Sequence, residues 1–352
     1  MAAAPSATGA VVVMTGASSG IGLNFARKAL ARGGIARFIL AARTPARCAE
    51  ALALVALPPG GATTTAQLPA PAAASVEPIT VNGARVEALP CDLGSLASVA
   101  EFAAAVRSIL GAASPIHLLV LNAGLISGSA FDRTARSTPD GYETTFATNH
   151  LAHFALARAL EPQLRVAGAA GGARIVLTSS DGHRMAKLPR GGRDEAAWRE
   201  VATVLGRGSC FAAYADSKLA NALHALELQR RLAGAGVSAN ALHPGGIRET
   251  GIWEPQRGFA SFLIDGIMFP LGRLCGAWQS VDEGGDAIAP CADPAAAGGQ
   301  YRNVARWVAP SKVASDPAVA AALWAASEAL VDAALAKGAA PTTTGGAREG
   351  AR

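Results

Sequence analysis

A glycine-rich turn placed directly after a short apolar run constrains this chain more than any other stretch. Residues 10–14 read Ala-Val-Val-Val-Met, a pattern typical of a buried strand, and residues 21–32 have helical spacing that ends at Gly33. Glycines between them let the backbone turn sharply towards a ligand, while a helix N-terminus offers N–H groups to an anion. The sequence therefore predicts a pyrophosphate site here. Its predicted contacts are Thr15, Gly16, Ser18, Ser19, Gly20, Ile21 and Gly22.

Strand and helix patterns alternate along the rest of the chain. Further strands are expected at residues 37–42, 85–89, 117–121, 174–178 and 237–242, and helices at 45–57, 95–110, 139–165, around Tyr214 and at 317–337. Such alternation predicts a parallel sheet with helices on both faces, and right-handed crossovers make it a doubly wound α/β fold of Rossmann type. We expect one domain over residues 10–337, between a short extension at 1–9 and a disordered tail at 338–352.

Three segments depart from the alternating pattern. Residues 58–83 are rich in Pro, Ala, Thr and Gly, and we expect a mobile surface insertion outside the core. Residues 184–208 form a basic, glycine-containing insertion. Residues 246–298 are expected to hold the substrate loop, and the apolar, aromatic part at 259–278 fits either a wall over a pocket or an ordinary buried loop.

Composition limits the function classes that remain open. The chain has 352 residues, of which 51% are hydrophobic and 16% charged, a balance that excludes a largely disordered protein. The net charge is +5, but the Lys and Arg residues form no stripe with interleaved aromatics, so nucleic acid is not an expected partner.

Cysteine spacing and hydropathy bear on metal binding and location. The five cysteines are far apart without a C-x-x-C pair, so neither a metal site nor a disulfide framework is expected. We expect a reducing, intracellular location, cytoplasmic or plastid. No membrane-spanning run and no signal peptide in residues 1–9 are expected. Peripheral membrane contact and homo-oligomer formation stay open.

The chemistry of the chain is predicted to centre on Tyr214 and Lys218. On a helix these residues, at i and i+4, lie on one face, so the phenol and the ammonium group would be neighbours. A free Tyr has a pKa near ~10, and a nearby cation lowers that pKa. The pair therefore predicts a general acid or base at Tyr214.

The end of the second strand bears on cofactor choice. Sites that prefer NAD place an acid about 20 residues beyond the glycines to bind the ribose 2′-hydroxyl. This chain has Ala42 there, followed by Arg43, whose guanidinium can bind the 2′-phosphate of NADP. The sequence therefore predicts NADP(H) as the cofactor.

The same glycine turn permits a different class of function. Residues 16–20 fit G-x-S-x-G, the nucleophile elbow of hydrolases, with Ser18 as nucleophile. That elbow would lie on the first strand and would leave Tyr214 and Lys218 without a role, so it is the less favoured hypothesis. A catalytically silent NADP-binding protein is a further alternative.

Seven motifs in order resemble the short-chain dehydrogenase/reductase family over residues 10–303. They are the glycine turn, Cys91-Asp92-Leu93, Asn122-Ala123-Gly124, Asn149, Ser179-Ser180, Tyr214-x-x-x-Lys218 and Pro244-Gly245. More narrowly, residues 149–154, 214–221 and 242–245 resemble the retinol dehydrogenase and protochlorophyllide reductase branch.

The resemblance implies a role for each matching residue. Tyr214 would protonate the carbonyl oxygen, Ser180 would hydrogen-bond that oxygen, and Asn149 would position a water in a proton relay. Lys218 would hold the nicotinamide ribose and lower the Tyr214 pKa. The further cofactor contacts implied are Asp92 and Leu93, the turn at Asn122, Ala123 and Gly124, and Pro244 and Gly245.

Several residues near these motifs carry weaker expectations. Asp181, Gly182 and His183 follow Ser180 and are predicted, on position alone, to line the substrate pocket. His150 and His153 are expected to pack rather than bind metal, because no acidic or thiol partner completes a site. The usual threonine after Pro244-Gly245 comes one place late, as Thr250.

The sequence thus predicts an NADP-dependent oxidoreductase. It would transfer hydride between NADPH and the carbonyl or alcohol of an apolar small molecule. Reduction of a protochlorophyllide-like pigment is the alternative within the family.

Overall fold

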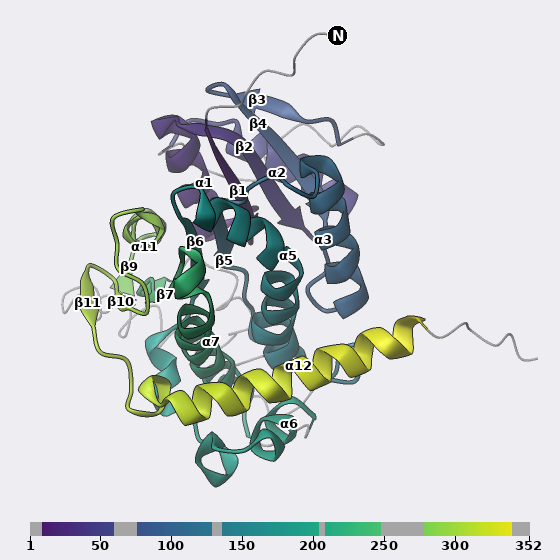
Figure 1. Cartoon of the computed structure of the whole chain (residues 1–352), viewed down its shortest axis with the longest axis vertical. Helices are drawn as coiled ribbons and strands as arrows, with labels where there is room; N and C mark the ends of the chain where they lie inside the picture. Colours follow the sequence, from purple (N-terminus) through teal and green to yellow (C-terminus); the bar gives the residue numbers. More distant parts are fainter. Residues whose placement is uncertain (1–8, 60–75, 129–135, 204–207, 248–277, 340–352) are drawn as a thin grey trace, which may run out of the picture.

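The computed structural model describes residues 9–59, 76–128, 136–203, 208–247 and 278–339 (Figure 1). Its centre is a nine-stranded sheet in the order β11-β10-β7-β6-β5-β1-β2-β4-β3. The parallel strands are β1 (Ala10–Thr15), β2 (Ile35–Ala42), β4 (Ala84–Pro90), β5 (Leu118–Leu121), β6 (Ala173–Thr178), β7 (Val237–His243) and β10 (Tyr301–Asn303). Strand order reverses between β1 and β5, so the predicted doubly wound fold is confirmed.

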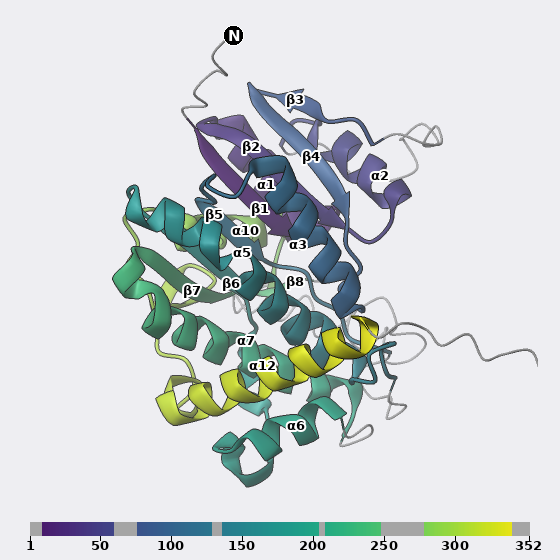
Figure 2. The same ribbon diagram turned by 45° about the vertical axis from the view of Figure 1, so that its right-hand side comes forward.

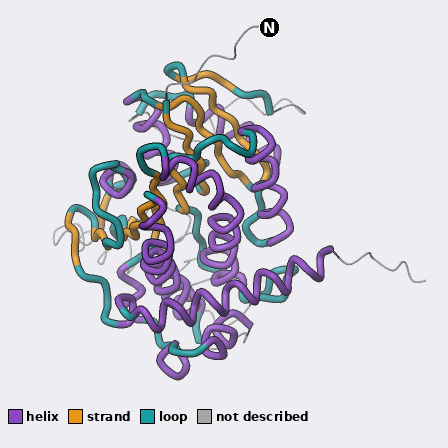
Figure 3. Tube along the Cα trace, viewed as in Figure 1, coloured by secondary structure: helices purple, strands orange, loops and turns teal. Residues whose placement is uncertain are grey.

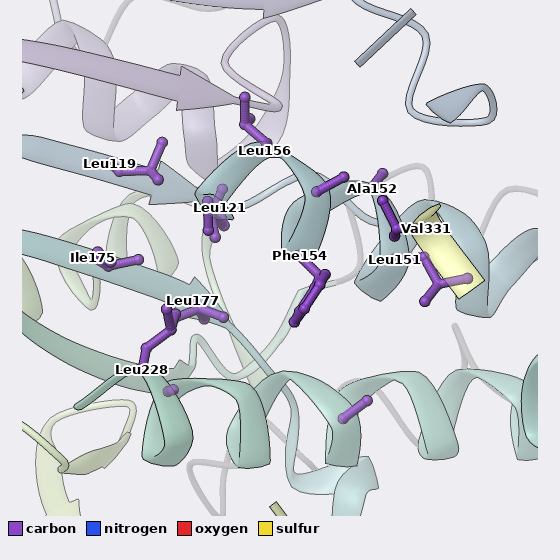
Figure 4. Close-up of a cluster of buried hydrophobic side chains, with 14 of the residues drawn as sticks. Leu119, Leu121, Leu151, Ala152, Phe154, Leu156, Ile175, Leu177, Leu228 and Val331 are labelled. Atoms are coloured by element: carbon purple, nitrogen blue, oxygen red, sulfur yellow. The ribbon is translucent and has the colours of Figure 1, made fainter. Parts of the chain in front are cut away.

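Helices cover both faces of the sheet because alternate residues of each strand face opposite ways. On β1, Val12 and Met14 join a core with α1 (Gly20–Arg32), α2 (Pro45–Val55) and α11 (Ala289–Ala292). Val13 joins the other core, with α3 (Leu96–Leu110), α5 (Ala152–Ala169) and α7 (Cys210–Leu232). Figure 3 shows the strands gathered between these helices, and Figure 4 shows Phe154 of α5 among leucines of β5 and β6.

The last helix, α12 (Pro317–Ala339), packs across α7, α3 and α6 (Glu195–Thr203), as Figures 1 and 2 show in yellow. Residues Pro317–Lys337 have a mean hydropathy of 1.5 and are long enough to cross a membrane. The expectation that no run reaches this length was therefore wrong. Half of that stretch is buried inside the protein, and a buried core helix has the same composition, so this is weak evidence for a membrane span.

Two predicted segments differ from the structure. β3 (Ile79–Val81) pairs antiparallel with β4 inside the segment expected to lie outside the core, and Ile79 and Val81 pack against buried residues. The helix expected at 139–165 begins later, as α4 (Thr144–Phe146), because Asp140 and Gly141 form a turn. It continues through a π-helical turn, η2 (Ala147–Leu151), into α5.

The described parts of the two later insertions also contain helices and strands. Residues 184–208 include η4 (Pro189–Gly192) and α6, whose buried Trp198 donates to the Gly192 carbonyl. Residues 278–298 hold β9 (Trp278–Gln279), which pairs with β8 (Gly246–Ile247), and α10 (Val281–Asp286), which packs on α1. The sheet is completed by the antiparallel edge strand β11 (Arg306–Val308). Short 3-10 turns lie at η3 (Asp181–Met185), η5 (Ala233–Ala235) and η8 (Val313–Ser315).

Candidate active site

The glycine turn lies at the carboxyl end of β1, beside the point where strand order reverses. Gly16 and Gly20 have φ values of 70° and 54°, a region that L side chains rarely adopt. A Cβ on Gly22 would stand 2.0 Å from the Gly16 carbonyl oxygen, so this position also requires glycine. Ser19 precedes α1 without a side-chain cap hydrogen bond, and Ser18 is partly exposed. Close backbone packing and a helix N-terminus without a side-chain cap fit the phosphates of a dinucleotide.

Thr15 lies in this turn but not at its surface. Its side chain is fully buried, and its hydroxyl oxygen accepts hydrogen bonds from the backbone N–H groups of Asn122 and Ala123 at 3.0 and 3.2 Å. The hydroxyl also lies 2.9 Å from Nε2 of His153. The Thr15 side chain therefore joins β1 to the residues after β5.

Asn122 holds together the ends of three adjacent strands. Its Nδ2 donates to the Gly16 carbonyl at 3.1 Å, and its Oδ1 accepts from the Thr178 hydroxyl at 3.1 Å. The support of the sheet implied for Asn122-Ala123-Gly124 is what this geometry provides. A Cβ on Gly124 would lie 3.1 Å from Lys218 Nζ, so the absence of a side chain there leaves room for the ammonium group.

Tyr214 and Lys218 lie one turn apart on α7, with both side chains buried. Lys218 Nζ stands 5.5 Å from the centre of the Tyr214 ring and donates to the Thr178 carbonyl at 3.0 Å. Burial lowers the pKa of Lys218 to about 8. The predicted pairing on one helix face is therefore present, at the carboxyl end of β6.

The structure distinguishes the two serines that follow β6. Ser179 is buried, and its hydroxyl donates to the backbone carbonyl of Lys218 at 2.7 Å. Ser180 is partly exposed, and its Oγ accepts from the Gly182 N–H at 3.1 Å. Ser180 also lies near Tyr214, since a Cβ on Gly182 would stand 3.4 Å from Ser180 Oγ and 3.7 Å from Cε1 of the Tyr214 ring, and its side chain lowers the pKa of that phenol. Only Ser180 offers its hydroxyl beside Tyr214, as the sequence predicted.

Asn149 lies in the π-helical turn, fully buried beside this group. Its amide side chain bonds both backbone groups of Leu125, at 2.8 Å through Oδ1 and 3.0 Å through Nδ2. Nδ2 also donates to the Ser217 hydroxyl at 3.0 Å. Asn149 thus connects the turn after β5 to the helix that carries Tyr214 and Lys218.

The electrostatic expectation for Tyr214 was wrong in this structure. Burial raises its pKa to about 12, and the opposing contribution comes from Ser180 rather than from Lys218. The pKa of Lys218, about 8, lies below that of Tyr214, so Lys218 has lost its proton before the phenol ionises.

Arg43 and Asp92 lie side by side at the ends of β2 and β4. Arg43 Nε stands 3.8 Å from Asp92 Oδ1, and the two side chains are 67% and 49% exposed. An ion pair this exposed contributes little, so the guanidinium can turn to another anion. Leu93, the next residue, packs partly buried against the core.

Pro244 and Gly245 follow β7 and are buried. Gly245 has a φ of 99°, and a Cβ there would stand 2.2 Å from the Gln279 side chain. Thr250 and the apolar segment 259–278 fall almost entirely outside the described residues, which resume at Trp278.

The histidines near the site are held by hydrogen bonds and ring contacts. His153 Nδ1 lies 3.1 Å from the Asn149 carbonyl and must donate to it, so Nε2 accepts from the Thr15 hydroxyl. His150 Nε2 lies 2.8 Å from the Ser327 hydroxyl. Within the described residues no group of three metal-ligating side chains occurs, and no histidine hydrogen-bonds to Ser18.

Ser217 is a site residue that the sequence did not predict. It lies between Tyr214 and Lys218, is fully buried, accepts from Asn149 and donates to the Tyr214 carbonyl at 2.8 Å. Its position in the middle of a predicted helix could have indicated this, because a serine hydroxyl there needs a hydrogen-bond partner.

Taken together, the reversal of strand order, the glycine turn and the Ser180–Tyr214–Lys218 group define a dehydrogenase-type oxidoreductase site. The model of the short chain dehydrogenase family matches residues 60–188. The chain is 33% identical to a WW domain-containing oxidoreductase of Danio rerio over 327 residues, which cover 91% of this chain and 68% of the relative. It is 32% identical to retinol dehydrogenase 13 of Homo sapiens, covering 92% of this chain and 85% of the relative.

A solved structure agrees with these relatives. An uncharacterized protein from Mycobacterium Paratuberculosis superposes with a TM-score of 0.62 at 30% identity, covering 93% of this chain and 95% of that one. The chain belongs to the short-chain dehydrogenase/reductase family, in its retinol dehydrogenase-like branch. It is therefore an oxidoreductase of the class that acts on alcohols and carbonyl compounds.

Proposed function

We propose that this protein is an NADP-dependent oxidoreductase that transfers hydride between NADPH and the carbonyl or alcohol carbon of an apolar small molecule. The observation that carries the proposal is the meeting of Ser180, Tyr214 and Lys218 at the carboxyl ends of the central strands, beside the glycine turn. The bound cofactor supplies or accepts the hydride; the residues of this chain bind, orient and move the proton.

Proton transfer is assigned to Tyr214. Its phenol is the acid that protonates the substrate oxygen in reduction, and the phenolate accepts that proton in oxidation. Ser180 lies beside it and donates a hydrogen bond to the same oxygen, which stabilises the charge that develops there. The pKa of about 12 keeps the Tyr214 phenol protonated near neutral pH.

Cofactor binding is assigned to the glycine turn, Lys218 and Arg43. The turn binds the pyrophosphate, Lys218 binds the nicotinamide ribose, and Arg43 binds the 2′-phosphate. Arg43 supports NADP over NAD because its guanidinium is exposed and its contact with Asp92 is long. Asn149, fixed between Leu125 and Ser217, positions the water of the proton relay.

An NADPH-oxidation screen over aldehydes, ketones and retinoids tests the proposal. We expect turnover of at least one apolar carbonyl compound, and Tyr214→Phe should lower kcat by about 10²–10⁴-fold while NADPH still binds. Tyr142→Phe is the matched control, since Tyr142 is a buried tyrosine whose hydroxyl donates to the distant Leu330 carbonyl.

Each alternative predicts a different result, in this screen or in an assay of its own reaction. Equal turnover by Tyr214→Phe would overturn the mechanism. Activity that depends on Ser18 and ignores Tyr214 would indicate a hydrolase. NADPH binding without consumption across the whole panel would indicate a silent binding protein, and light-dependent pigment reduction would indicate the protochlorophyllide reductase-like alternative.

A further inference from the structure

The short helix after Ser180 is attached to the last parallel strand of the sheet. Asn303 Nδ2 donates to Asp181 Oδ2 at 2.6 Å, and the Tyr301 hydroxyl donates to Asp181 Oδ1 at 3.5 Å. Tyr301 and Asn303 belong to β10, about 120 residues further along the chain. The backbone that follows the catalytic serine is therefore held by a distant segment.

His183 forms the second attachment, and its hydrogen bonds define its protonation. Its Nδ1 lies 2.7 Å from the Ser180 carbonyl oxygen, and its Nε2 lies 3.0 Å from the Ser311 backbone nitrogen. A backbone N–H can only donate, so Nε2 must accept. Nδ1 then carries the hydrogen and donates to Ser180. His183 is therefore a neutral imidazole that connects the Ser180 peptide to the segment after β11.

Burial and neighbouring groups maintain this neutral form. His183 is 1% exposed, and its ring lies 5.1 Å from the Tyr301 ring, centre to centre. Burial lowers the pKa of His183, with Arg184 acting in the same direction. The prediction that His183 lines the substrate pocket was wrong, because its ring is enclosed between Ser180, Tyr301 and Ser311.

The position of Ser180 depends on this short helix. The Ser180 hydroxyl accepts from the Gly182 N–H, and the Ser180 carbonyl accepts from both the N–H and Nδ1 of His183. A shift of the helix would therefore carry the Ser180 hydroxyl away from Tyr214. Displacements of about 1 Å in a catalytic group can cost up to about 100-fold in rate.

We propose that His183 is a positioning residue that holds the Ser180 peptide against Tyr301 and Ser311, so that the Ser180 hydroxyl stays beside Tyr214. The inference rests on the proposed function, since it assigns His183 a role only through Ser180. Asp181 supports the same arrangement through Asn303.

A double-mutant cycle on the full chain tests this dependence. His183→Phe is expected to lower kcat for a carbonyl substrate by at least about tenfold, with the Kd for NADPH unchanged within about twofold. In a Ser180→Ala background the same change should alter kcat by less than about twofold, because the group it positions is already gone. His183→Asn retains a donor near the Nδ1 position and should recover part of the activity.

Two further variants keep the test decisive. Arg193→Gln is the control, because Arg193 is 67% exposed and pairs with Asp316 rather than with Ser180, Asp181 or His183. If His183→Phe does not fold, Tyr301→Phe removes a hydroxyl beside the same ring and keeps the buried ring itself. We expect a smaller loss of kcat, again absent in the Ser180→Ala background.

Three outcomes would overturn the inference. The first is a folded His183→Phe enzyme with unchanged kcat. The second is a loss of equal size with and without Ser180, which would mean that His183 acts on stability alone. The third is a fully active Ser180→Ala enzyme, because the group that His183 would position is then dispensable while the proposed activity remains. The proposed function itself would instead fail if the unaltered chain consumed no NADPH across the panel, which distinguishes the two failures.

Discussion

Lys218 donates a hydrogen bond from Nζ to the backbone carbonyl of Thr178, with 3.0 Å between nitrogen and oxygen. The same carbonyl accepts from Asn221 Nδ2 at 3.2 Å. The lysine is 2% exposed, so its ammonium group is bound to the end of β6 instead of being solvated. Because this cation is buried, its loss of a proton changes the free energy of unfolding when the pH is raised into the alkaline range.

The contribution of Lys218 to stability, measured as the difference between the unaltered chain and Lys218→Met, should rise between pH 8 and about 10.5; the buried thiols, whose pKa values are raised, act in the opposite direction in both proteins. Burial lowers the Lys218 pKa to about 8, whereas the unfolded chain titrates near ~10.4, so the unfolded state binds more protons in this window. This contribution to the free energy of unfolding therefore rises with pH, by at most about 1.4 kcal/mol per unit. Urea unfolding at several pH values measures it. A difference between the unaltered chain and Lys218→Met that does not change over this pH range would contradict the assignment.

Arg43→Ala should weaken NADPH binding by about 10- to 100-fold and leave NADH binding nearly unchanged. The reason is the loss of a charge-assisted hydrogen bond to the 2′-phosphate, worth about 1.5–3 kcal/mol. Fluorescence titration with both cofactors measures the two Kd values. Arg47→Ala is the matched control, since Arg47 is also exposed but pairs with Glu50 on α2. Equal weakening for both cofactors would exclude 2′-phosphate recognition.

Gly22→Ala should destabilise the turn and abolish tight NADPH binding. The added methyl group would stand 2.0 Å from the Gly16 carbonyl and 2.5 Å from Asn122 Nδ2, so the backbone of the turn must move. We expect a cost of about 1–3 kcal/mol in the free energy of unfolding. Gly234→Ala is the control, because no heavy atom lies within 4 Å of a Cβ built there. If the Gly22→Ala protein binds NADPH normally, the close packing of Gly22 against the Gly16 carbonyl is not required for cofactor binding.

Thr15→Val should lower stability more than cofactor affinity. The valine matches threonine in shape but leaves the N–H groups of Asn122 and Ala123, and Nε2 of His153, without the Thr15 oxygen. Buried groups without partners cost about 1–3 kcal/mol. Thr203→Val is the control, since Thr203 is exposed and bonds only the Arg199 carbonyl within the described residues. Normal stability with lost NADPH affinity would instead support Thr15 as a cofactor contact.

Local patterns predicted the sheet and the catalytic helix well. Strands such as Val11–Met14 are continuous apolar runs because both faces are covered, and Tyr214 and Lys218 follow from helical spacing alone. Of the two serines that the family resemblance offered, Ser180 follows from its distance along the strand that starts at Arg174, and the structure turns the Ser179 hydroxyl to the Lys218 carbonyl instead.

Contacts between segments far apart in the sequence could not be predicted from local patterns. The strand at Ile79–Val81 is too short to have a pattern of its own and exists through its pairing with β4. The attachment of His183 to Ser311 joins residues 128 positions apart, and no local signal encodes it. The direction of the Tyr214 pKa shift was missed for the same reason, since burial depends on the whole fold.

The π-helical turn at Ala147–Leu151 fixes how many residues this segment of the chain must contain. Such a turn accommodates one residue more than an α-helix would, and it lies between Phe146 and Ala152. Removal of one residue would let this turn close into an ordinary α-helix, so α5 could keep its face while Asn149 would lose its position between Leu125 and Ser217. The extra residue of this segment is therefore what lets Asn149 reach both Leu125 and Ser217 from within a continuous helix.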